Sequence, residues 1–143
     1  MMKNRMKKVR APRRNDKGAS ILEFGLVVLV FYAFVFGVMD FGRALYSYHF
    51  VSHAAREATR YAIVHGAQSS APATANDIAQ YVKAITPDGI DPNAITVSTT
   101  WSPDNAPGSN VKVQVQDNFH FVMPLLLTTQ LNLSSASQMV ISN

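Results

Sequence analysis

The sequence predicts an α+β protein in which a long N-terminal helix packs against a small antiparallel sheet with one short extra helix. Three observations lead to this prediction. Residues 19–39 carry no charged side chain apart from Glu23, residues 40–65 keep a helical apolar period without any Pro, and two later segments alternate with a period of two. The 143 residues leave room for one modest core.

The positive charge of the chain is concentrated at its N-terminus. Residues 1–17 hold eight Lys or Arg and one Asp, a net charge of +7, whereas the whole chain carries +4, so residues 18–143 have a net charge of −3. A mildly acidic body argues against a basic nucleic-acid-binding domain, and we predict no nucleic-acid partner. The chain has no Cys, which excludes disulfides, thiolate nucleophiles and Cys-ligated zinc.

The apolar run at residues 19–39 is predicted to cross a membrane once. As a helix, its 21 residues extend about 31 Å, which matches a hydrocarbon core of about 30 Å. The alternative is a buried core helix, but the rest of the chain has little apolar surface to cover one. The basic leader places the N-terminus in the cytoplasm. The predicted divisions are a leader at 1–18, a helix at 19–66 whose stem is 40–66, and an exported α+β domain at 67–143.

Gly18 marks a candidate processing site on the cytoplasmic side of the apolar run. The far side lacks the small-x-small pattern of an ordinary signal peptidase site. A cut after Gly18 would make Glu23 the fifth residue of the product and would create an α-amino group at Ala19 for the carboxylate to meet. Without the cut, Glu23 is an interfacial residue that marks the depth of the helix in the membrane.

The stem is predicted to present one apolar face and one polar face. Small residues near its end (Ala54, Ala55, Ala58 and Ala62) allow close packing, either on the chain's own sheet or on neighbouring stems. Glu57 can reach Arg60 at a spacing of three residues. His49, His53 and Glu57 share a face but lack a completing ligand, so we predict no metal site. The predicted apolar stripe is Phe41, Ala44, Leu45, Tyr48, Val51, Ala55, Ala58 and Ala62.

The exported portion is predicted to contain a loop, a short helix and a sheet with one solvated face, packed on the upper stem. Asn76 is the expected helix cap, and Pro87 the expected stop. The apolar block at residues 121–127 is either core or a contact surface. The expected extended segments are residues 94–101, 110–116, 119–123 and 130–141.

Three motifs in order resemble known sequences of bacterial pili. The basic leader ending at Gly18, followed by Glu23 and Phe24, is similar to the class III signal of type IV prepilins of the Tad (Flp) kind. The run Asp40, Phe41, Gly42 and Arg43 and the later run with Arg56, Glu57, Arg60 and Tyr61 resemble the TadE-like family.

The resemblance implies a minor pilin or pseudopilin of the bacterial inner membrane, which could join an extracellular pilus after assembly. A prepilin peptidase would cut it between Gly18 and Ala19. The implied partners are other Tad pilins or pseudopilins and the inner-membrane assembly platform. The implied roles are pilus assembly, surface attachment and biofilm formation, with Glu23 and Phe24 acting in assembly and the stem motifs making contacts.

No enzyme signature occurs in the sequence, so we predict a non-enzyme without catalytic residues, cofactor or metal. The acidic residues beyond the stem sit singly, and we interpret most of them as turn residues. The alternative function is an uncleaved single-pass envelope protein whose exported domain scaffolds a secretion complex or binds a ligand. The acids in question are Asp77, Asp88, Asp91, Asp104 and Asp117.

Overall fold

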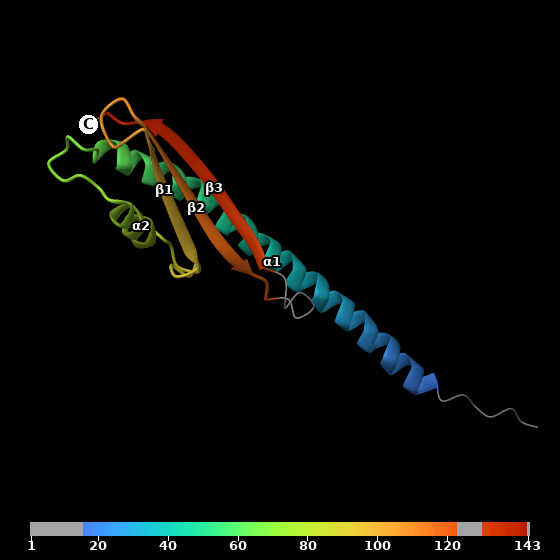
Figure 1. Cartoon of the computed structure of the whole chain (residues 1–143). Coiled ribbons are helices and arrows are strands. Elements are labelled where there is room, and N and C mark those ends of the chain that lie inside the picture. The colour runs from blue at the N-terminus through green and yellow to red at the C-terminus, as the bar shows by residue number, and fades with distance from the viewer. Residues whose placement is uncertain (1–15, 123–129, 143) are drawn as a thin grey trace, which may run out of the picture. The chain divides into compact units, whose positions relative to one another are not determined.

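The computed structural model describes residues 16–122 and 130–142 (Figure 1). It forms two compact units, Met1–Val35 and Phe36–Asn143, and the first helix, α1 (Asp16–Val64), contributes to both. The fold is α+β, as the sequence predicted. Residues 1–15 of the predicted leader and residues 123–127 of the predicted apolar block lie outside the described residues.

The first unit is helical throughout its described part, and α1 begins at Asp16, three residues before the predicted start. The side chains of residues 18–35 are exposed, apart from half-buried Val28 and Ala33. Phe24 and Phe34 are each 70% exposed. By length and composition α1 is able to cross a membrane, and among the described residues none of its most apolar stretch is buried.

In the second unit α1 continues through the predicted stem and ends at Val64, and the stem packs as predicted only in its upper part. Ala54, Ala55 and Ala58 are fully buried, as is Val51. Below residue 50 the predicted stripe is wrong, because Phe41, Leu45 and Tyr48 are exposed while the polar Asp40 and Ser47 are buried. The buried face is therefore rotated, and the polar side chains on it bind groups at the end of the sheet.

The sheet has the order β1-β2-β3 and is antiparallel throughout, with β1 (Ile95–Ser102), β2 (Asn110–His120) and β3 (Gln130–Val140). Val97 pairs with Val115, which pairs with Ser135. The predicted separate strand at 119–123 is wrong, since Phe119 and His120 complete β2 by pairing with the start of β3.

One face of the sheet covers the stem, and the other faces solvent, as predicted. Alternate residues of β2, among them Val111, Val113 and Val115, are fully buried in the core with the stem alanines. Lys112 between them is exposed. Figure 1 shows the three strands running along the upper part of α1, with α2 beside β1.

The short helix α2 (Ala75–Ala84) begins one residue before the predicted cap. Thr74 rather than Asn76 is the cap, because its hydroxyl accepts from the backbone N–H of Asp77 at 3.3 Å while the Asp77 carboxylate accepts from the Thr74 N–H at 2.9 Å. Ile78 and Val82 insert into the core. The helix ends three residues before Pro87.

Candidate interaction site on the stem helix

The carboxylate of Asp40 fastens the end of β2 to the stem. Asp40 is 2% exposed, and each of its oxygens accepts from the backbone N–H of Val122 at 3.0 Å. Its Oδ1 also accepts a hydrogen bond from the Arg43 guanidinium at 3.0 Å. The two residues, three positions apart on the helix, form an ion pair. These contacts compensate the burial of the charge. Asp40, the acidic residue that begins the Asp40–Arg43 motif, therefore has a structural role.

Arg43 extends the same contact to the last residues of β2. Its guanidinium lies 5.1 Å from the centroid of the Phe119 ring and donates a long hydrogen bond of 3.5 Å to the carbonyl of His120. A guanidinium over an aromatic face is an attractive arrangement. Asp40 and Arg43 together join the stem to the strand that reaches its lower end.

The two middle residues of this motif are turned outward. Phe41 is 69% exposed. Gly42 is exposed, and a Cβ at this position would meet no heavy atom of the described residues within 4 Å. Packing within the described part of the chain thus does not require a small residue at position 42.

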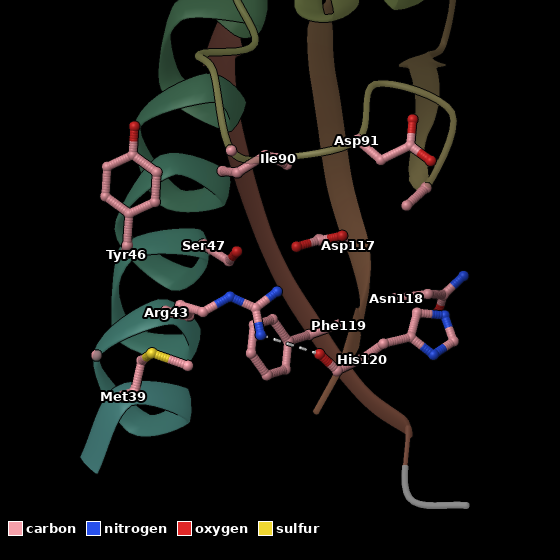
Figure 2. Close-up of a pocket in the computed structure, with 13 residues that line it drawn as sticks. Met39, Arg43, Tyr46, Ser47, Ile90, Asp91, Asp117, Asn118, Phe119 and His120 are labelled. Carbon is pink, nitrogen blue, oxygen red and sulfur yellow. Dashed lines mark hydrogen bonds between the residues drawn. The ribbon is translucent and has the colours of Figure 1, made fainter. Parts of the chain in front are cut away.

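Next to the Asp40–Arg43 contact lies an open cavity of about 550 Å³ between the stem, the end of β2 and the loop before β1. Asp117 of β2 and Ser47 of α1 are directed toward each other across it, and Asp91 lies at its edge (Figure 2). The apolar part of its wall includes Met39, Ile90 and Phe119.

This cavity was not predicted, because most of the single acidic residues were interpreted as turn residues. Asp117 is not a turn residue, since it belongs to β2 and is 4% exposed. The signal was available in the alternation. Position 117 continues the inward-facing series 111, 113 and 115, so an acid there breaks the apolar pattern.

Burial raises the pKa of the Asp117 carboxyl above its ordinary value, and the negative charge of Asp91 adds to this rise. A hydrogen bond from the Ser47 hydroxyl and the nearby His120 act in the opposite direction. Desolvation outweighs them, so the charged form of Asp117 is held at a cost to folding.

We expect Asp117→Asn to be more stable than the parent chain at pH 7 and to lose that advantage in acid. A raised folded-state pKa favours folding below the ordinary pKa, and this contribution disappears as the pH rises through the folded value. The pKa values of Asp77 and Asp104 are lowered by their hydrogen bonds and act with the opposite sign in both chains. Urea unfolding of the pair at several pH values checks this, and a constant difference would contradict it.

The second stem motif is divided between packing and solvent. Tyr61 stacks between His65, at 4.2 Å between ring centroids, and Tyr81 of α2, at 4.6 Å, so it joins α2 to the stem. Arg56 is exposed and donates to the backbone carbonyl of Ser52. Within the described residues, the predicted contact between Glu57 and Arg60 does not form an ion pair, and Arg60 is exposed.

The predicted processing and assembly residues lie in the first unit. Gly18, Ala19, Glu23 and Phe24 are all exposed positions within α1. In the described part of the chain, no group of three or more His, Asp or Glu side chains is placed to hold a metal ion.

The described structure is that of a membrane-anchored, single-pass α+β protein, as indicated by one long apolar N-terminal helix and a small sheet on its stem. Residues 18–60 match the family model of the TadE-like protein, which confirms the resemblance found in the sequence. The match covers the apolar helix and most of the stem, so this part of the chain is similar to TadE-like proteins, and the similarity supports an association with a Tad pilus. No curated protein and no solved structure matches it.

Proposed function

We propose that this chain is a minor pilin or pseudopilin of a Tad (Flp) pilus. A prepilin peptidase removes residues 1–18, the helix anchors the product in the bacterial inner membrane with its N-terminus cytoplasmic, and the domain is exported. It then joins other Tad pilins at the inner-membrane assembly platform and contributes to surface attachment and biofilm formation. The match to the TadE-like family, which spans both the exposed apolar helix and the stem, carries the proposal.

The exposure of α1 supports the helix as both anchor and assembly surface. Phe24, Leu29 and Phe34 are each 68–70% exposed in the isolated chain. Removing such surface from water contributes about 25 cal/mol per Å² in lipid or among packed helices. The same segment is thereby suited to leave the bilayer for a bundle of pilin helices, and Glu23 provides the polar group that fixes its register there.

We expect Glu23→Ala to insert in the membrane but to fail to assemble. Loss of one carboxylate makes insertion easier, whereas the bundle loses the group that pairs with the new α-amino group at Ala19. The measurement compares the chain in the membrane fraction with the chain that co-purifies with pilin partners. Asp88→Ala, which removes an exposed acid outside the motifs, is the matched control. Normal co-purification of the Glu23 variant would contradict its role.

The N-terminus of the protein isolated from its native host tests the processing step. Intact mass should show a chain that begins at Ala19. A working protein that begins at Met1 or Met2 would instead favour an uncleaved envelope protein whose domain scaffolds a secretion complex or binds a ligand.

A further inference from the structure

Asp117 presents a buried carboxylate to an open cavity without a full set of partners. It is 4% exposed, and within residues 16–122 and 130–142 the Ser47 hydroxyl is its hydrogen-bond donor. An ionised carboxylate has about four acceptor sites, so most of its capacity is unused. The guanidinium of Arg43, which lines the same cavity, is held by Asp40. A cation entering the cavity would therefore meet a charge that has already been taken out of water.

The shape and lining of the cavity suit a long side chain with a cationic end. Met39, Ile90 and Phe119 form an apolar wall beside Asp117, and the exposed Asp91 lies at the edge. Arg and Lys side chains match this arrangement, because their methylene stems pack on apolar surface while their charged ends seek a carboxylate. A guanidinium also offers several donors to one carboxylate.

The stem of the same chain carries such a group. Arg60 is exposed and has no ion pair within the described residues. It lies 13 positions beyond Ser47, about 20 Å along the helix. Arg60 also lies 18 positions, about five helical turns, beyond Gly42, so the two residues are on the same face of the helix. Gly42 lines the cavity, and the space beside it is open within the described residues.

We propose that the cavity around Asp117 receives the Arg60 side chain of a second copy of this chain. Two parallel stems that meet on this face, staggered by about 20 Å, bring Arg60 of one copy to the cavity of the next. The contact is heterologous, so each added copy leaves one free Arg60 and one free cavity, and the series does not close. This contact between copies rests on the proposed pilin function only for the place where the copies meet, in the membrane or the pilus.

Cross-linking of the full chain in membranes tests this contact, and the chain's lack of Cys makes every introduced Cys unique. Arg56→Cys places a thiol about one helical turn from Arg60 and leaves the Arg60 guanidinium in place. Asp91→Cys places a second thiol at the edge of the cavity. The two variants are co-expressed with different tags and treated with a short bismaleimide, since a disulfide requires Cα atoms within about 7 Å. We expect a mixed dimer from the two single variants and a ladder of higher species from the double variant.

Two matched controls define the background. Asp88→Cys replaces an exposed acid three positions from Asp91 that does not line the cavity, and Lys112→Cys replaces an exposed basic residue on the solvated sheet face. Mixed dimers no more abundant than with these controls, or a double variant that stops at dimers, would overturn the proposal.

Asp117→Asn and Arg60→Gln test the charge pair itself within the same cross-linking experiment. Asp117→Asn is placed in the chain with Asp91→Cys, Arg60→Gln in the chain with Arg56→Cys, and urea unfolding of each shows separately that it folds. Each change should weaken association about tenfold, as for one lost charge pair, and both together should weaken it little further. Unchanged yields of the mixed dimer would contradict the pairing.

The same gels distinguish failure of this contact from failure of the proposed processing. A ladder from chains that keep Met1 would uphold the contact and reject the cut after Gly18. Chains that begin at Ala19 but give no ladder would uphold the cut and reject the contact.

Discussion

Asp40→Ala is expected to lower the free energy of unfolding of the unit Phe36–Asn143 by about 2–4 kcal/mol. The change removes both acceptors of the Val122 N–H and the ion-pair partner of Arg43. Water can replace part of the loss at Arg43, whose side chain is 41% exposed. The end of β2 should then separate from the stem more easily than the rest of the sheet.

Trp101 gives this measurement a single internal probe. It is the only Trp of the chain and packs against the core of the unit. Its fluorescence in urea, on the full-length protein in mild detergent, reports the unfolding midpoint. Asp88→Ala, which removes an exposed acid, should shift that midpoint very little. Equal stability of the Asp40 variant and the Asp88 control would show that the contacts of Asp40 do not hold the strand.

Ala58→Leu is expected to destabilise the same unit by about 1–3 kcal/mol, because it adds volume where no space exists. Ala58 is fully buried in the core that it shares with Val113 and Val115. A longer side chain must push the sheet away from the stem or adopt a strained rotamer. The change leaves the helix propensity almost untouched, so the loss is one of packing.

Ala84→Leu is the control for this substitution, because Ala84 is an exposed helical alanine in α2. Unfolding of both variants is followed by Trp101 fluorescence as above. A stable Ala58 variant would mean that the stem meets the sheet loosely. In that case the stem alanines would be better placed for contacts with neighbouring stems, the alternative that the sequence left open.

The sequence predicted the fold class and the order of elements because hydrophobic periodicity reports which residues need cover. The upper stem, with Ala55 and Ala58, and the alternation of β2 follow this rule directly. The lower stem does not. There the sheet end offers a backbone N–H at Val122, so the helix turns Asp40 inward and leaves Phe41 outside. A stripe of apolar residues cannot reveal a polar partner that lies 82 positions away.

The residues at positions 40 and 43 were identified by resemblance, but the groups that they contact were not predicted. Asp40 and Arg43 were expected to make contacts, and the structure directs those contacts to the end of β2. Asp117 was missed although the alternation of β2 places position 117 on the buried face, and the Ser47 hydroxyl that it meets belongs to a different element. Pairings between distant elements depend on the three-dimensional arrangement, which local pattern does not encode.

The stem is fastened to the sheet near both of its ends. At the lower end Asp40 holds Val122, and at the upper end the Ser142 hydroxyl donates to the carbonyl of Ile63 at 3.1 Å. When a tensile load is applied along the helix axis, these two attachments and the packed alanines between them share it side by side rather than in succession. Such a joint resists sliding better than peeling, which is the mechanical property that the proposed withdrawal of the helix from a bilayer requires.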